Sequence, residues 1–206
     1  MTAVKTQIWL EPWDISRRIN ELGLRLDLLH NIVRQVIEAG EQATLHHAAN
    51  AEGTYRYQEG VYALRKAFVG DKWEISRENS VETIKNDKLK IKVAFTNVDL
   101  ACNHEHDPQP RSKKGEGAEK TCSGNTPLLP NETWAKYARP ENGEWKTFYL
   151  MVDREGAAEL SQPVVSEETF KSFIERIFLT DSAEYRHTSS GDDGTAVVFD
   201  PQISRK

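Results

Sequence analysis

An alternation of apolar and charged side chains between residues 88 and 95 limits the possible folds more than any other feature of the chain. Leu89, Ile91, Val93 and Phe95 alternate with Lys88, Lys90, Lys92 and Ala94. A period of two is typical of a β-strand that has one apolar and one solvated face. The segment therefore predicts a half-buried strand in a sheet.

The N-terminal region contains a heptad stripe of apolar residues that follows Pro12 and Asp14 and ends at Gly40. The stripe consists of Ile15, Ile19, Leu22, Leu26, Leu29, Val33 and Val36. This spacing predicts one long helix over residues 14–39. Such a helix either packs on a second helix of the same chain or contributes to a homo-oligomer seam. A second helical pattern, from Tyr55 to Gly70, supplies a partner within the chain.

The remaining segments alternate between strand and turn signals. We expect strands at 72–77, 133–139, 144–152 and 195–199, a polar connector at 78–87, and an amphipathic helix that Ser166 opens. The predicted fold is α+β. An N-terminal helical hairpin packs on a mostly antiparallel sheet of about five or six strands, and a further amphipathic helix lies near the C-terminus. We expect a single domain over 1–206, with a helical part (12–70) and a sheet-containing part (71–206) that includes a long loop (100–132).

Composition narrows the class of protein. The net charge of −5 is spread along the chain, which argues against general coating of nucleic acid but allows a local anion site. No apolar run is long enough for a membrane helix, and the N-terminus lacks the features of a signal peptide. These observations predict a cytoplasmic protein with no membrane association, in which Cys102 and Cys122 are reduced thiols or metal ligands.

The strand and the loop that follows it form the first candidate site. Lysines on one face of the strand, the polar end of the strand and the basic loop could together form a site for an anion. Glycines in the loop would let backbone N–H groups approach a phosphate. The candidate ligand-binding residues are Lys88, Lys90, Lys92, Asn97, Arg111, Lys113 and Lys114. The alternative is that the strand lysines only solvate the sheet and discourage edge pairing, and that Asn97 is a turn residue.

A metal site is the second candidate. Cys102, His104 and His106 project to one side of an extended backbone, and Cys122 could complete a tetrahedral zinc site. The spacing matches no familiar zinc motif, so a solvated loop with incidental histidines and thiols is the alternative.

A third candidate is catalytic. Asp99 and Asp153 each follow a predicted strand, and they could share a divalent cation in a metal-dependent phosphodiesterase or nuclease. The preferred hypothesis remains a binding or regulatory protein for an anionic ligand, such as a nucleotide, a nucleic acid or an acidic partner. The other alternative is a protein–protein interaction module without catalytic activity, in which the loop orders on meeting its partner.

Overall fold

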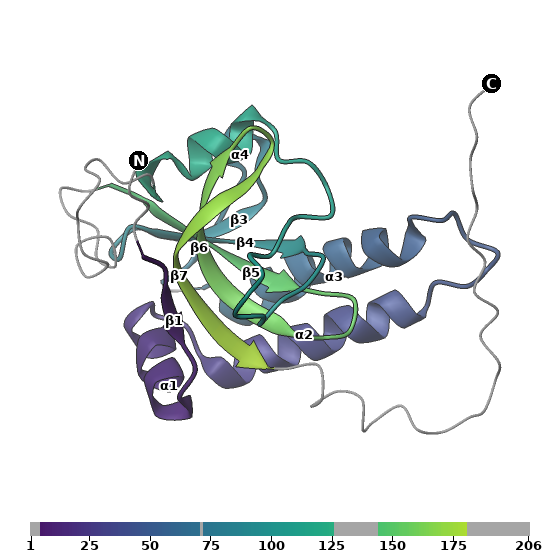
Figure 1. The fold of residues 1–206 in the computed structure, drawn as a ribbon, viewed down its shortest axis with the longest axis horizontal. Coiled ribbons are helices and arrows are strands. Elements are labelled where there is room, and N and C mark those ends of the chain that lie inside the picture. The colour runs from purple at the N-terminus through teal and green to yellow at the C-terminus, as the bar shows by residue number, and fades with distance from the viewer. Residues whose placement is uncertain (1–4, 71, 126–143, 181–206) are drawn as a thin grey trace.

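The computed structural model describes residues 5–70, 72–125 and 144–180 (Figure 1). In these residues, the α-helices are α1 (Pro12–Glu21), α2 (Leu26–Glu41), α3 (Ala51–Phe68) and α4 (Glu116–Thr121), and two short 3-10 turns are η1 (Glu78–Ser80) and η2 (Ser123–Asn125). The strands are β1 (Gln7–Trp9), β2 (Glu74–Ser76), β3 (Thr83–Asn86), β4 (Ile91–Asn97), β5 (Lys146–Val152), β6 (Ala158–Ser166) and β7 (Thr169–Thr180).

The strands form one mixed sheet in the order β1-β7-β6-β5-β4-β3-β2. Two neighbouring pairs, β1 with β7 and β4 with β5, are parallel, and the other pairs are antiparallel. The α+β class is confirmed, but the expectation of a mostly antiparallel sheet of five or six strands is wrong. Because β4 and β5 are parallel neighbours, their carboxyl ends lie at the same edge of the sheet.

Each face of the sheet has its own covering layer. Helices α1, α2 and α3 pack on one face, where Phe95, Phe148 and Leu150 meet residues such as Leu29 and Leu64 in the main core. The other face is covered by α4 and the segments around it, through a smaller core that includes Ala118, Tyr149 and Phe170 (Figure 1). Strand β4 is therefore central and covered on both faces, which differs from the half-solvated strand expected from its lysines.

The predicted long helix over residues 14–39 is two helices. Gly23 takes a left-handed backbone conformation, with φ of +72°, which ends α1 and turns the chain before α2 begins. Most of the heptad stripe is buried against the sheet, so internal packing accounts for the apolar pattern that suggested an oligomer seam. No helix in the described parts of the chain is long and apolar enough to cross a membrane.

The predicted C-terminal helix is strand β7, which pairs with β6 on one side and β1 on the other. Glu167 and Glu168, expected in the first helical turn, instead have φ of 51° and 66° in the tight turn between β6 and β7. Both faces of β7 are covered and its register with β6 shifts at bulges. Its apolar residues therefore lack a period of two and resemble a helical stripe.

Two further differences concern the segments beside β4. The expected polar connector over 78–87 contains strand β3, and the expected loop over 100–132 contains α4 and η2 in its described part. The predicted strands at 133–139 and 195–199 lie outside the described residues.

Gly60 sets how closely α3 approaches the sheet. A Cβ atom on this residue would lie 2.4 Å from the Phe95 ring, whereas a Cβ on Gly53 of the same helix meets nothing closer than 4.0 Å. We therefore expect Gly60→Ala to destabilise the protein by about 1–3 kcal/mol, despite the higher helix propensity of alanine. The matched Gly53→Ala variant should be neutral or slightly stabilising, and thermal unfolding of both variants measures the difference. Equal melting temperatures for the two variants would contradict this packing.

Candidate functional site

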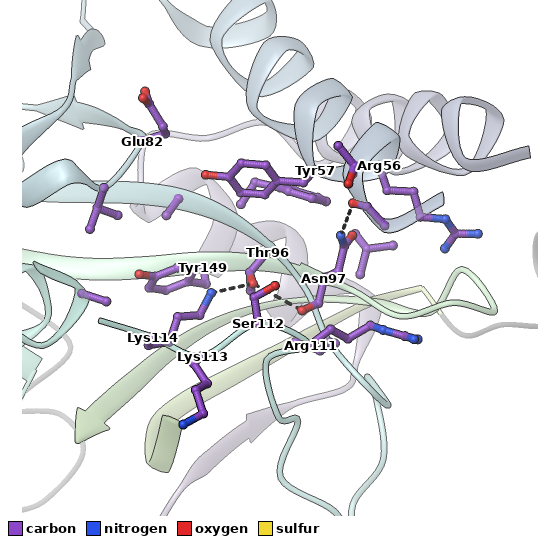
Figure 2. A pocket seen from close by; sticks show the side chains of 18 of the residues that line it. Arg56, Tyr57, Glu82, Thr96, Asn97, Arg111, Ser112, Lys113, Lys114 and Tyr149 are labelled. Atoms are coloured by element: carbon purple, nitrogen blue, oxygen red, sulfur yellow. Dashed lines mark hydrogen bonds between the residues drawn. The ribbon is translucent and has the colours of Figure 1, made fainter. Parts of the chain in front are cut away.

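A cleft of about 850 Å³ lies along the carboxyl-terminal parts of β4 and β5, between α3 and the segment that leads into α4 (Figure 2). This volume lies within the range of small-molecule sites in proteins. Five cationic and three acidic side chains line it. They are Arg56, Arg111, Lys113, Lys114 and Arg154, with Glu52, Glu82 and Asp153.

Lys114 forms part of the cleft wall. Its Nζ atom donates a hydrogen bond to Thr96 Oγ1 at 2.8 Å, and lies 5.3 Å from the Tyr149 ring centroid and 5.5 Å from that of Phe170 (Figure 2). No carboxylate forms an ion pair with it among the described residues. Burial lowers the pKa of Lys114 to about 8, because the apolar surroundings disfavour the charged amine.

Arg111 supplies the second cation of the cleft without an acidic partner. Its backbone N–H donates to the Asn97 carbonyl oxygen at 3.1 Å, which fixes the start of the 111–114 segment against the end of β4. The side chain is exposed, and no ion pair joins its guanidinium to an acidic residue in the described ranges. Arg111 can therefore offer several N–H donors to an anion in the cleft.

The acidic side chains of the cleft are all engaged. Glu52 pairs with Arg56 at 3.2 Å and with Arg154 at 3.3 Å, and Glu82 pairs with Arg65 and Arg77. The remaining lining cation, Lys113, pairs with Glu168 on the protein surface. Among the described residues, Lys114 and Arg111 are therefore the lining cations that have no carboxylate partner.

Arg56 closes one end of the cleft. It is 7% exposed, and its Nη1 donates to the carbonyl oxygens of Asp153 and Arg154 at 2.9 and 3.0 Å. These bonds tie α3 to the turn that follows β5. Burial lowers the pKa of Arg56, and its buried Nε atom has no hydrogen-bond partner among the described residues.

Asn97 and Tyr57 complete the polar and aromatic lining. The Asn97 Nδ2 donates to the Gly53 carbonyl oxygen at 2.8 Å, while its buried Oδ1 accepts no hydrogen bond from the residues that the structure describes. Tyr57 of α3 is 37% exposed and packs on Phe95 with ring centroids 6.4 Å apart. Figure 2 shows Tyr57 on the α3 side of the strands, with Tyr149 and Lys114 on the other side.

Of the seven predicted ligand-binding residues, the structure places Asn97, Arg111, Lys113 and Lys114 in the cleft. The three strand lysines lie elsewhere. Lys90 and Lys92 lie over the Trp145 ring, at 4.9 and 5.0 Å, and Lys92 is buried in an ion pair with Glu78. Lys88 is exposed in the turn before β4. The expected row of lysines on a solvated strand face is therefore wrong.

The two candidate catalytic aspartates have structural contacts. Asp99 Oδ1 accepts from the backbone N–H groups of Leu100 and Gln109, and its Oδ2 lies 2.9 Å from His106 Nε2. Asp153 accepts from the N–H groups of Ala101 and Ala157, and burial raises its pKa. Both carboxylates close local turns, which accounts for their position at strand ends.

The four candidate zinc ligands do not converge. Cys102 Sγ lies 3.1 Å from the carbonyl oxygens of Ala158 and Thr180, so its S–H group can donate to either, and burial raises its pKa. Cys122 is buried, which raises its pKa to about 12, and His104 packs against the Phe178 ring. Among the residues that the structure describes, no group of three or more His, Cys, Asp and Glu side chains could hold a metal ion.

The sequence analysis did not select Arg56, Tyr57 or Thr96 as site residues. Arg56 and Tyr57 reach the cleft from a helix that is about forty residues away from the loop in sequence, and no local pattern marks that contact. Comparisons with protein-family models, curated proteins and solved structures find no match for the chain.

Proposed function

We propose that the chain is a cytoplasmic binding or regulatory protein that recognises an anionic ligand in the cleft between α3 and the 111–118 segment. Lys114 and Arg111 are the groups that hold the anion. The observation that carries this proposal is that neither cation has a carboxylate partner in the described part of the chain, although Lys114 is packed against two aromatic rings. The two free thiols, Cys102 and Cys122, fit the reducing cytoplasm.

An anion in the cleft would offset the free-energy cost of the positive charge on Lys114. A protonated amine in an apolar wall costs free energy unless an opposite charge approaches it. A phosphate or carboxylate in the cleft would supply that charge, so binding should raise the pKa of Lys114 and draw a proton onto the amine. Arg111 would add a charge-assisted hydrogen bond at the exposed side of the same cleft.

Binding of phosphate-bearing probes tests the proposal. The probes are inorganic pyrophosphate, ATP and a single-stranded DNA oligonucleotide, and affinity is measured by titration calorimetry. We expect Lys114→Met and Arg111→Met each to weaken binding by about ten- to hundredfold, because each removes a charge-assisted hydrogen bond. Lys120→Met is the matched control, since Lys120 is exposed on α4, pairs with Glu116 and does not line the cleft.

The stability of Lys114→Met separates loss of binding from loss of fold. With a pKa lowered to about 8 from an ordinary 10.5, Lys114 binds a proton more weakly in the folded chain than in the unfolded chain. The protonated amine therefore opposes folding below pH 8, and this cost falls as the pH rises toward 10.5. Lys114→Met should accordingly keep or raise the melting temperature at pH 7. Wild-type protein that binds none of the three probes would refute the proposed function.

A further inference from the structure

Two adjacent lysines of the cleft have opposite surroundings. Lys113 is exposed, and its ion pair with Glu168 raises its pKa. The Lys114 amine is packed against Tyr149 and Phe170, and among the described residues its hydrogen-bond partner is a hydroxyl oxygen, Thr96 Oγ1. The chain thus holds one charged and one readily deprotonated amine side by side, and the second is the one that lines the interior of the cleft.

We propose that the Lys114 amine is a nucleophile that condenses reversibly with the carbonyl group of an anionic aldehyde or ketone bound in the cleft. This inference rests on the proposed function, but for such a ligand Arg111 alone holds the anionic group, and the Lys114 amine stays neutral and meets the carbonyl group. The geometry supports it in two ways. The hydrogen bond to Thr96 orients Nζ, and the absence of a carboxylate partner among the described residues leaves no ion pair to break before the reaction.

The reaction needs only the neutral amine and the carbonyl compound. The nitrogen lone pair forms a bond to the carbonyl carbon while the π electrons move to the oxygen. The nitrogen then loses a proton and the oxygen gains one, which gives a carbinolamine. Loss of water from the carbinolamine gives the imine, and addition of water reverses the reaction. No oxidant or reductant takes part.

The surroundings of Lys114 increase the fraction of its side chain that is deprotonated and therefore nucleophilic. An amine with a pKa of about 8 is neutral about a tenth of the time at pH 7, whereas an ordinary lysine is neutral less than about a thousandth of the time. A lower pKa also makes an amine intrinsically less nucleophilic, so the gain in rate is smaller than the ratio of these fractions. We expect Lys114 to react about tenfold faster than Lys113 or Lys120.

Pyridoxal 5′-phosphate, an anionic aldehyde, is the probe. The protein is mixed with an equimolar amount, the imine is reduced with cyanoborohydride, and peptide mass spectrometry gives the modified fraction of each lysine. We expect Lys114 to carry most of the label, with a rate that rises through pH 8 and then levels. Labelling of exposed lysines should still increase at that pH. Label that spreads evenly over Lys113, Lys114 and Lys120 would overturn the proposed nucleophile.

Two comparisons separate the amine chemistry from the anion site. Lys114→Arg keeps a positive charge but removes the nucleophile, so it should lose the label and still bind pyrophosphate, while Lys120→Arg should retain both properties. Pyridoxal without its phosphate should label Lys114 at least about tenfold more slowly, because it lacks the group that Arg111 holds. Equal labelling by the two aldehydes would support the nucleophile and overturn the anion site. Undiminished label in Lys114→Arg would overturn the nucleophile alone.

Discussion

Replacement of Arg176 by methionine is expected to lower the free energy of unfolding by about 3–5 kcal/mol, because it leaves Glu159 as a buried charge without its partner. The two side chains are 1% and 0% exposed. Arg176 Nε and Nη2 donate to the two carboxylate oxygens of Glu159, at 2.9 and 2.7 Å. In a chain of this length such a loss corresponds to a fall in melting temperature of about 6–20 °C.

Arg176 also anchors the segment that leads to the cleft. Its Nη1 donates to the carbonyl oxygens of Asn103 and His106, both at 3.0 Å, and so holds this segment against β7. A few residues later the same segment supplies Arg111 and Lys114. We therefore expect Arg176→Met protein that remains folded at low temperature to bind pyrophosphate more weakly than wild type does.

A second substitution identifies the cause of the destabilisation. If the buried charge of Glu159 is responsible, Glu159→Gln in the Arg176→Met background should recover a large part of the lost stability. Arg34→Met is the matched control, because the Arg34–Glu38 pair is exposed and its nitrogen and oxygen atoms are 3.9 Å apart. Its removal should change the free energy of unfolding by less than about 0.5 kcal/mol. An Arg176→Met variant as stable as the Arg34→Met variant would contradict a stabilising role for this ion pair.

The sequence predicted the elements whose patterns arise from local packing. Helix α3 shows a continuous helical stripe before Gly70, and it occupies Ala51–Phe68. The strand expected over 144–152 is β5, and all seven of its residues are buried. Helix α3 packs against the sheet along one face, and β5 is buried within the sheet. In both elements the spacing of apolar residues in the sequence therefore matches the side chains that are buried.

Long-range pairing explains where the sequence prediction of the fold was wrong. The residues of β7 have helical spacing, but they pair with β1 across the length of the chain, and no local preference records that contact. The lysines before and within β4 suggested a solvated face. Lys92 is instead covered because Glu78, from η1, forms an ion pair with it. An ion pair between separate elements makes a charged residue compatible with burial, and the sequence alone gives no sign of it.

The candidate site was predictable on one side only. Asn97, Arg111 and Lys114 lie on the strand end and the basic loop that sequence reasoning selected, because polar residues at a strand end need partners. The opposite wall comes from α3, where Arg56 and Tyr57 had no local feature to mark them. Which lysine faces the cleft was also not predictable, since Lys113 and Lys114 are neighbours of the same type and differ only in tertiary contacts.

The buried side-chain amide of Asn125 holds the α4 and η2 segment on the sheet. We expect its loss to lower the stability of the fold strongly, as the loss of Arg176 does. The Asn125 side chain is 0% exposed and makes four hydrogen bonds. Within the described part of the chain, its Nδ2 donates to the carbonyl oxygens of Thr147 and Pro163, and its Oδ1 accepts from Thr147 N–H and Gln162 Nε2. This one residue ties the end of the α4 and η2 segment to β5 and β6.

Asn125→Asp keeps the shape of the side chain but replaces the two donors with a carboxylate that faces two carbonyl oxygens. We expect the free energy of unfolding to fall by about 3 kcal/mol or more, since two buried acceptors lose their donor and a charge enters the core. Urea denaturation measures this as a lower midpoint with an unchanged slope. The matched variant Asn20→Asp, at an exposed position of α1, should be near neutral. Because α4 supplies Ala118 to the cleft wall, a stable Asn125→Asp variant would mean that other contacts hold this wall in place.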